Sequence, residues 1–231
     1  MNVKILQLLE GAREARGLTV IIDVFRAFSL EAYLFAMGAE KIFPVGDEAL
    51  ARCLKAENLE FILAGERSGK ILSGFDTGNA PSELHKIDVK NKTVVHTTSA
   101  GTQGIANALY ADEILGASLV NARATAEYIK RSGAENVSLV CMGWMAQYPT
   151  DEDTLCAEYI KSLVENTPFD IEAGVEGLKH TSGAKFFDLK QNDVFPREDF
   201  FMCTDVDKFD FVMKLVKDET EIPYMINQKI K

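Results

Sequence analysis

Short apolar runs alternate with segments of helical periodicity along most of the chain. The runs expected to form β-strands are residues 18–23, 41–45, 61–65, 93–97, 118–121 and 137–143. The segments expected to form helices are residues 27–37, 47–56, 102–110, 122–131 and 151–164. Gly38 follows the first of these helices, where a glycine commonly ends a helix. The alternation predicts an α/β fold, a layered α/β/α arrangement with a mainly parallel or mixed sheet.

The length of 231 residues allows one large domain or two small ones. We expect a single α/β domain over residues 1–231, and two similar α/β lobes meeting near residue 120 would fit the same alternation. Residues 166–199 are richer in Gly, Asp and Lys, and they are expected to form an excursion between two lobes.

Several predicted strands end in charged or glycine-rich segments. Asp23 and Arg26 follow the first strand, Glu66 and Arg67 follow the third, and Trp144 follows the last. Ligands of open α/β sheets bind beyond the carboxyl ends of the strands, so these side chains are expected to share one rim. Carboxylates and guanidinium groups that converge there would suit Mg²⁺ together with a phosphate ester.

Asp23 has two interpretations. It could cap the helix that follows, because an aspartate at an N-cap accepts hydrogen bonds from free backbone N–H groups. It could equally bind a metal or act as a nucleophile, with Arg26 turned toward a phosphate at the helix N-terminus. Arg26 favours the second interpretation, because the helix dipole disfavours a cation in the first turn unless an anion lies nearby.

Glu66, Arg67 and Asp76 are less specific signals. Glu66 and Arg67 could form an exposed ion pair, which would contribute little to stability. Asp76 lies in the turn-rich segment 74–81, for which an ordinary loop is the default interpretation. The neighbouring Phe75 could anchor that loop and hold the Asp76 carboxylate inward.

The segment from residue 97 to residue 104 is rich in hydroxyl groups and glycine. Thr98, Ser99, Gly101 and Thr102 lie where a predicted strand leads into a helix. Backbone N–H groups and hydroxyls at such a junction can cradle a phosphate or a carboxylate. An ordinary Ser/Thr helix cap explains the same residues about equally well.

Three acids open the predicted helix at residue 151. Thr150 with Asp153 resembles a capping box, and acids in the first turn suit the helix dipole. Successive side chains point in different directions, however, so Glu152 or Asp153 could face the rim beside Trp144. Carboxylates close to one another and to Asp23 would repel unless a divalent cation lay between them.

Composition narrows the class of protein. The net charge of −10 argues against a nucleic-acid partner and against an anionic membrane surface. The chain has no apolar run near the roughly 20 residues that span a bilayer, and no recognisable signal peptide. Four separated cysteines without a Cys-x-x-Cys pair suggest reduced thiols, so we expect a cytoplasmic protein. The three histidines form no metal spacing, and His96 is expected to pack inside a strand.

Taken together, the motifs resemble the 2-phosphosulfolactate phosphatase family. The matching pieces are Ile22-Asp23-Val24-Phe25-Arg26-Ala27, Gly38-Ala39, Gly65-Glu66-Arg67, Gly74-Phe75-Asp76-Thr77-Gly78-Asn79-Ala80-Pro81, Asn121-Ala122, Cys141-Met142-Gly143-Trp144 and Glu152-Asp153-Thr154-Leu155-Cys156-Ala157. Each piece is modest alone, but their number and order are specific. One departure is Ala100-Gly101-Thr102, where many members have Asn-Gly-Thr, and it removes one amide donor.

The resemblance implies a Mg²⁺-dependent acid phosphatase associated with coenzyme M biosynthesis. Its substrates would be 2-phosphosulfolactate and related 2-phospho-hydroxycarboxylic acids. The metal ligands are expected among Asp23, Glu66, Asp76, Glu152 and Asp153. The expected catalytic residues are Asp23, Arg26, Glu66 and Arg67. The expected substrate-binding residues are Asn79, Thr98, Ser99, Gly101, Thr102, Asn121 and Trp144.

Two other functions fit the same residues. A phosphoryl transferase or mutase would use the same metal and arginines, and a non-catalytic protein that binds organic-acid anions would use the same charges. In each case the partner is a small anion. A homodimer is compatible with the sequence, which does not fix the oligomeric state.

Overall fold

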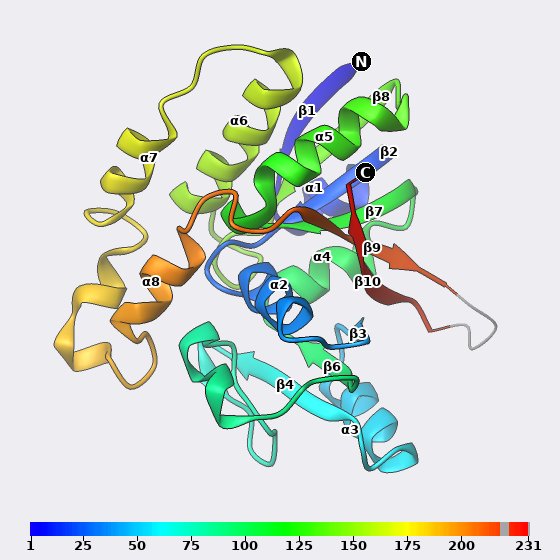
Figure 1. Cartoon of the computed structure of the whole chain (residues 1–231), viewed down its shortest axis with the longest axis vertical. Coiled ribbons are helices and arrows are strands. Elements are labelled where there is room, and N and C mark those ends of the chain that lie inside the picture. Colours follow the sequence, from blue (N-terminus) through cyan, green and yellow to red (C-terminus); the bar gives the residue numbers. More distant parts are fainter. Residues whose placement is uncertain (218–221, 231) are drawn as a thin grey trace.

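The chain forms one mixed β-sheet with helices on both faces (Figure 1). The structure, a computed structural model, describes residues 1–217 and 222–230. The strands are β1 (Asn2–Gln7), β2 (Gly17–Ile22), β3 (Lys41–Pro44), β4 (Ile62–Arg67), β5 (Lys70–Ile71), β6 (Thr93–Thr97), β7 (Ala111–Ala117), β8 (Asn136–Cys141), β9 (Phe211–Val216) and β10 (Tyr224–Lys229).

The α-helices are α1 (Leu8–Glu14), α2 (Ala27–Ala36), α3 (Glu48–Glu57), α4 (Gly101–Asn107), α5 (Ala122–Ser132), α6 (Asp151–Glu165), α7 (Ile171–Leu178) and α8 (Arg197–Cys203). Shorter 3₁₀ segments are η1 (Pro81–Lys86), η2 (Leu119–Asn121), η3 (Ala184–Phe187) and η4 (Leu189–Gln191).

The sheet has two parallel sections that an antiparallel hairpin joins. Its strand order is β1-β8-β2-β7-β9-β10-β3-β6-β4-β5. Strands β1, β8, β2 and β7 are parallel, as are β3, β6 and β4. Strands β9 and β10 pair antiparallel with each other and with their outer neighbours. At the β10–β3 junction the pairing is limited to Met225 and Ile42.

The central strands β2 and β8 are buried over nearly their whole length because helices cover both of their faces. In β2, Val20 and Ile22 belong to a buried cluster that includes residues of α5 and α6. Ile21 belongs to the cluster on the opposite face, with residues of α1, α2 and α4. This division follows from the alternation of side chains along a strand. The predicted α/β/α layering with a mixed sheet is therefore confirmed, and the division into two lobes stays a prediction.

Most predicted elements are present, with one wrong assignment and several omissions. Gly38 follows α2 with a φ of 95°, which confirms its predicted role as the residue that ends this helix. The strand predicted at residues 118–121 is wrong, because β7 ends at Ala117 and Leu119–Asn121 form a 3₁₀ turn. Buried apolar side chains in that turn imitate a strand in the sequence. Strands β1, β5, β7, β9 and β10 and helices α1, α7 and α8 were not predicted.

Residues 166–203, here called the covering segment, run along one side of the molecule from α7 to α8 (Figure 1). Its last helix, α8, packs against α2 and η1. Buried Phe200 and Cys203 lie three positions apart on α8, and Asp199 is buried beside them.

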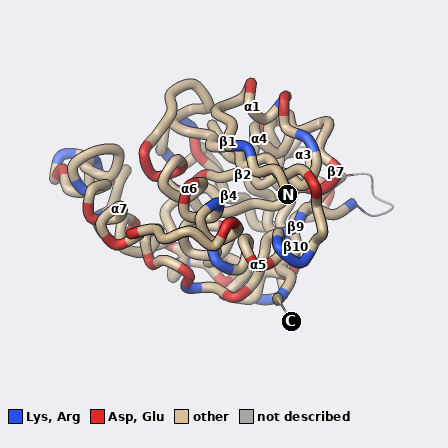
Figure 2. Tube along the Cα trace, turned by 90° about the horizontal axis from the view of Figure 1, so that it is seen from above, with Lys and Arg blue, Asp and Glu red and all other residues tan. Residues whose placement is uncertain are grey.

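Charges of both signs are interspersed along the described trace (Figure 2). Among the described residues, no helix combines the length and apolar character that crossing a membrane requires. The expectation that neither nucleic acid nor a membrane is a partner stays a prediction.

Candidate active site

A small cavity of about 20 Å³ lies beyond the carboxyl ends of β2 and β8, in one parallel section of the sheet, and of β4 and β6, in the other. Its wall comes from the segments after β2, β4, β6 and β8, together with Asn79 and Phe195. The structure thus brings together, at this cavity, five residues that the sequence placed on a common rim: Asp23, Arg26, Glu66, Ser99 and Trp144. Ser68 and Met145, which also line it, have φ values of 53° and 56°. Such left-handed conformations are costly for residues other than glycine and often occur at functional sites.

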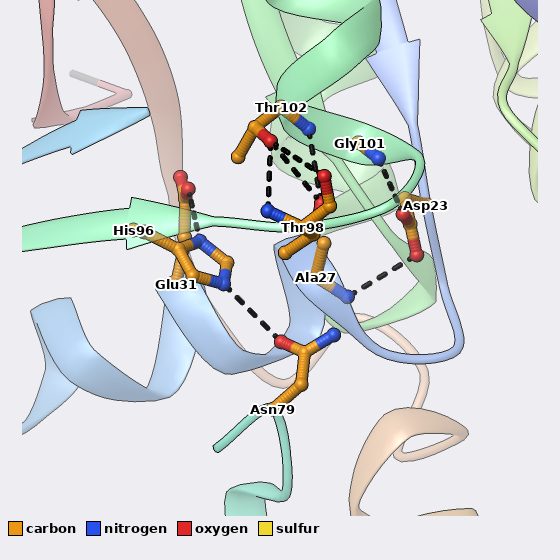
Figure 3. Close-up of polar contacts among 8 residues, drawn as sticks. All are labelled: Asp23, Ala27, Glu31, Asn79, His96, Thr98, Gly101 and Thr102. Carbon is orange, nitrogen blue, oxygen red and sulfur yellow. Dashed lines mark hydrogen bonds and ion pairs between the residues drawn. The ribbon is translucent and has the colours of Figure 1, made fainter. Parts of the chain in front are cut away.

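Asp23 is held between the first residues of two helices (Figure 3). Its Oδ1 accepts from the backbone N–H of Ala27 at 3.1 Å, and its Oδ2 accepts from the N–H of Gly101 at 2.8 Å. A Cβ at position 101 would lie 3.0 Å from Asp23 Oδ2, so this approach requires glycine. Asp23 therefore accepts a hydrogen bond from the first N–H group of α2, as the capping interpretation expected. It also lines the cavity, as the functional interpretation expected.

Burial raises the pKa of Asp23 to about 7. Loss of hydration is the largest cause, and the nearby Glu66 and Glu152 carboxylates raise the pKa further. The amides of Ala27 and Gly101 lower it in part. Asp23 can thus exchange a proton near neutral pH, a property common among catalytic carboxylates.

Asp153 ties the segment after β2 to the segment after β8. Its two carboxylate oxygens accept from the N–H groups of Val24 and Gly143, each at 2.8 Å. The predicted capping box is wrong, because the Thr150 side chain makes no capping hydrogen bond and Asp153 turns inward. Burial raises the pKa of Asp153, and the Glu152 and Asp23 carboxylates add to the increase.

Glu152 is the least satisfied acid of the group. It is 3% exposed, and among the described residues its Oε2 has no hydrogen-bond partner. Burial raises the pKa of Glu152, while the positive charge of Lys185 opposes the increase. A buried oxygen of this kind is suited to an added cation.

Glu66 links the segments after β4 and β6. Its Oε1 accepts from Ser99 N–H at 2.8 Å, and its Oε2 accepts from Gly69 N–H at 2.6 Å. The amides of Ser99 and Gly101, expected to hold a substrate anion, therefore bind the protein's own carboxylates. In this structure, the N–H groups that were predicted to bind a substrate anion bind the carboxylates of Glu66 and Asp23.

Arg26 supplies positive charge at the cavity and has a buried acidic partner. Its Nη1 lies 2.6 Å from Asp199 Oδ2, and its Nη2 donates to the Gly69 carbonyl at 3.2 Å. The other Asp199 oxygen accepts from Ser82 N–H at 2.9 Å. Asp199 therefore fixes Arg26 from the covering segment. Sequence reasoning missed Asp199, which looks like an ordinary acid in the first turn of a helix.

Lys185 is a second cation near the same group of acids. Its Nζ lies 4.8 Å from the ring centroid of Trp144 and 5.3 Å from that of Phe195. Within the described part of the chain it has no ion pair or hydrogen bond. Burial lowers the pKa of Lys185, and Glu152 is the largest opposing influence. Sequence reasoning missed Lys185. The signal that could have identified it is that two phenylalanines follow this lysine in an otherwise polar stretch.

Other predicted site residues lie elsewhere or serve the backbone. Asp76 Oδ2 accepts from Leu63 N–H at 2.8 Å and lies 3.6 Å from Lys55 Nζ, and Asp76 does not line the cavity. Arg67 donates to the Glu66 carbonyl at 2.7 Å and to a threonine hydroxyl of β6 at 3.1 Å, and it too is outside the lining. The expected direct roles of Asp76 and Arg67 are not supported by these positions.

Asn121, Thr98 and Thr102 are buried structural residues in this fold. Asn121 Oδ1 accepts from Ser118 N–H at 2.9 Å in the turn before α5. The Thr98 and Thr102 hydroxyls each accept from the other residue's N–H, at 3.2 and 2.9 Å (Figure 3). They shape the start of α4, and none of the three residues lines the cavity. Short-range hydrogen bonds account for all three residues, and for Thr98 and Thr102 a local structural role was one of the two interpretations of the sequence.

The donor chemistry of the site suits a hard divalent cation. Asp23, Glu152 and Asp153 concentrate buried carboxylate oxygens, one of which, Glu152 Oε2, is without a partner in the described structure. Oxygen ligands and excess negative charge are what Mg²⁺ requires. Among residues 1–217 and 222–230, however, no three His, Cys, Asp or Glu side chains are already arranged as a ligand set. The site fits the ion in chemistry, with water or substrate oxygens needed to complete its coordination.

Comparison with known proteins identifies the group to which this site belongs. Residues 4–218 match the family described as 2-phosphosulpholactate phosphatase. The chain belongs to the 2-phosphosulfolactate phosphatase family. This confirms the resemblance found in the sequence, and the enzyme class of the family is phosphoric monoester hydrolase.

Relatives named probable 2-phosphosulfolactate phosphatase are similar over most of their length. A protein of Bacillus subtilis (strain 168) is 36% identical over 211 residues, which cover 89% of this chain and 90% of the relative. A protein of Caldanaerobacter subterraneus subsp. tengcongensis is 32% identical over 210 residues, covering 85% and 86%. A protein of Caldicellulosiruptor saccharolyticus is 40% identical over 154 residues, covering 64% and 63%. The family match over residues 4–218 includes every segment that forms the wall of the cavity.

Proposed function

We propose that this protein hydrolyses the phosphate ester of 2-phosphosulfolactate, giving sulfolactate and inorganic phosphate, in a reaction that requires Mg²⁺. The proposal extends to related 2-phospho-hydroxycarboxylic acids. The observation that carries it is a group of buried acids, Asp23, Glu152 and Asp153, within electrostatic reach of Lys185, with Arg26 beside Asp23 in the lining of the cavity. A small substrate with several acidic groups needs positive charge from both the protein and a metal.

Each group has a role that follows from its surroundings. Arg26, fixed by Asp199, binds the phosphoryl or sulfonate oxygens, and Lys185 adds charge from the covering segment. Asp23, Glu152 and Asp153 would hold Mg²⁺, which would offset charge on the phosphoryl oxygens when bound. The ionised Asp23 carboxylate would then either accept a proton from the attacking water or attack phosphorus itself with departure of the alcohol oxygen, leaving an aspartyl-phosphate for water to hydrolyse.

The size of the cavity adds one condition. Its volume of about 20 Å³ is close to that of one water molecule, so substrate entry requires movement at the mouth. Phe195 belongs to the covering segment and lines the cavity, so a shift of this segment would open the site. The direction of entry would then be past Phe195 and Trp144.

A phosphate-release screen tests the function. Purified protein is given 2-phosphosulfolactate, 2-phospholactate and a simple aryl phosphate, with Mg²⁺ and then with EDTA. We expect phosphate release from the first two, loss of activity with EDTA, and recovery when Mg²⁺ is restored. Absence of release with Mg²⁺, or release indifferent to EDTA, would contradict the proposal.

The same assay separates the two other functions. A transferase or mutase would pass the phosphoryl group to an added hydroxy acid faster than to water. A non-catalytic anion-binding protein would bind 2-phosphosulfolactate and release no phosphate. Acid quenching during turnover of a phosphorus-labelled substrate distinguishes the two roles of Asp23, because only nucleophilic attack leaves label on the protein.

A cytoplasmic location, a place in coenzyme M biosynthesis and a homodimeric state belong to the same proposal. The place in coenzyme M biosynthesis follows from the family resemblance, and none of the three is needed for the chemistry.

A further inference from the structure

The Asn79 side chain has one occupied end and one free end. Its Oδ1 accepts from His96 Nε2 at 3.2 Å, whereas its Nδ2 has no partner in the described structure. Asn79 lines the cavity beside Asp23, Arg26 and Glu66. Figure 3 shows the amide nitrogen on the side of the group away from His96. Two N–H donors are therefore available at the cavity, provided that the amide keeps this orientation.

A buried acid–base pair stands behind Asn79. His96 Nδ1 lies 2.8 Å from Glu31 Oε1, and both side chains are 0% exposed (Figure 3). His96 comes from β6 and Glu31 from α2, so the pair links the sheet to the helix that begins beside Asp23. Glu31 Oε2 has no hydrogen-bond partner in the described part of the chain.

The position of the proton on this pair decides which way Asn79 faces. If Glu31 were a carboxylate and His96 a neutral imidazole with its hydrogen on Nδ1, the pair would carry a net negative charge in the protein interior. The Oε2 atom of Glu31 would then be a charged oxygen without a hydrogen bond, which is strongly unfavourable. An uncharged pair with the proton on Oε2 would instead leave a buried O–H without an acceptor, which is also unfavourable.

The remaining neutral arrangements agree on one point. In an imidazolium–carboxylate pair, both ring nitrogens of His96 carry hydrogen. In an imidazole–carboxylic acid pair, Glu31 donates to Nδ1 and the ring hydrogen is again on Nε2. Either way His96 Nε2 is a donor, Asn79 Oδ1 must be its acceptor, and the Asn79 NH₂ group is directed away from His96.

We infer that Glu31 and His96 are positioning residues that hold the Asn79 carboxamide with its NH₂ group toward the substrate, where it donates to a phosphoryl oxygen. The ligand in this inference rests on the proposed phosphatase function. A flipped carboxamide would present Oδ1 instead, and a carbonyl oxygen repels an anion. The Glu31–His96 pair thus determines whether Asn79 presents a hydrogen-bond donor or an acceptor to the cavity.

The first test concerns the proton and needs no activity. The chain has three histidines, so the ring ¹⁵N signals of His96 can be assigned in the full-length protein by comparison with His96→Gln. We expect Nε2 to be protonated. An Nε2 that carries no hydrogen would overturn the inference, whether or not the protein releases phosphate.

The second test measures binding of inorganic phosphate, the expected product, by calorimetry with Mg²⁺ present. Asn79→Asp replaces the donors with acceptors at equal size and should raise the dissociation constant about 100-fold. Asn192→Asp makes the same change at an exposed position and should leave it unchanged. Equal constants for the two variants, or no phosphate binding by the unaltered protein, would overturn the role of Asn79 as an anion ligand.

A double-mutant comparison separates positioning from general support of the fold. Glu31→Gln should weaken phosphate binding about tenfold in the natural chain and have no further effect in an Asn79→Ala background, because its influence passes through Asn79. An equal loss in both backgrounds would overturn the positioning role. If Glu31→Gln does not fold, His96→Leu and His96→Gln replace it. His96→Gln keeps a donor for Asn79 Oδ1 and should restore binding relative to His96→Leu, and failure of that rescue would also count against the inference.

Discussion

The two walls of the active site are built in different ways. On the strand-end wall, Asp23 and Glu66 each accept hydrogen bonds from two backbone N–H groups, and Asp153, outside the lining of the cavity, does the same for the segments after β2 and β8. On the covering segment, Lys185 has ring contacts without a hydrogen bond in the described chain, and Asp199 has an ion pair with Arg26. Backbone amides fix the first wall rigidly, whereas side chains alone connect the second to the site. The difference indicates that backbone hydrogen bonds hold the negative charge in place and that side chains of the covering segment help to balance it.

The largest expected effect lies on the strand-end wall. Asp23→Asn should lower kcat/KM for 2-phosphosulfolactate about 1,000-fold, because it would remove the proposed proton acceptor and metal ligand. The melting temperature of the metal-free protein should change little, because relief of a buried charge is opposed by the loss of the acceptor for one of two backbone N–H groups. Phosphate release and thermal unfolding measure the two results.

Asp47→Asn is the matched control, because Asp47 also accepts from a backbone N–H at a helix start, at 2.9 Å, and lies away from the site. It should lower stability slightly and leave activity unchanged. Similar activities for the two variants would mean that Asp23 only caps a helix.

Lys185→Met tests the covering segment by keeping the apolar stem and removing the charge. We expect kcat/KM to fall about 100-fold, mostly through a higher KM, because one cation near the acids of the site is lost. Steady-state kinetics measure this effect. Lys190→Met, on the exposed part of the same segment, should be neutral. If both variants keep full activity, the covering segment supplies no charge to the reaction.

Asp199→Asn weakens the contact between the two walls. Arg26 would lose its ion-pair partner at 2.6 Å, so we expect kcat/KM to fall about 10- to 50-fold and the free energy of unfolding to fall by about 2 kcal/mol. Kinetics and urea denaturation measure both. Asp193→Asn, exposed on the same segment, serves as the control. A loss of stability with unchanged kinetics would show that Asp199 does not position Arg26.

The response to Mg²⁺ should depend on pH. The pKa of Asp23 is raised to about 7 in the folded state, so the native protein binds more protons than the unfolded chain between about pH 4 and 7. Without metal, stability contributed by this group therefore falls as the pH rises through that window. Mg²⁺ favours the ionised carboxylate, and 10 mM Mg²⁺ should raise the melting temperature by roughly 5 °C more at pH 8 than at pH 5. Equal shifts at both pH values would argue against a metal at Asp23.

The smallest effect is expected at Asp76, which belongs to neither wall. Asp76→Asn should change kcat/KM by less than about threefold, because its carboxylate contacts Leu63 N–H and Lys55 outside the cavity. Steady-state kinetics at saturating Mg²⁺ measure this change in kcat/KM, with Glu66→Gln as the comparison because Glu66 lines the cavity. A large loss in Asp76→Asn would show that the segment around it moves into the site during turnover.

Strand periodicity and the position of charged residues after the strands were sufficient to predict the strand-end wall. Asp23, Arg26 and Glu66 line the cavity as the rim argument required. Thr98, Thr102 and Asn121 carried the same kind of signal, yet they make short-range hydrogen bonds in their own turns. A hydroxyl or amide side chain that follows a strand can point into the site or bond within its own turn. The residue type is the same in both cases, so the sequence could not predict which way the side chain points.

Asp153 shows why local patterns can mislead. Thr150 and Asp153 have capping-box spacing, but the amides of Val24 and Gly143 compete for the same carboxylate from distant parts of the chain. Those two donors are buried, and leaving them without acceptors would cost more than losing a cap. Tertiary contacts therefore decided the orientation.

The sequence by itself determined the alternation of strands and helices, the family, and the acids and arginine that follow the strands, because these depend on periodicity and order along the chain. Only the tertiary structure decided that Lys185 and Asp199 approach the site and that a buried histidine–glutamate pair stands behind Asn79. These residues lie in unrelated segments of the chain. Their chemistry arises from burial and from charges that meet only after folding.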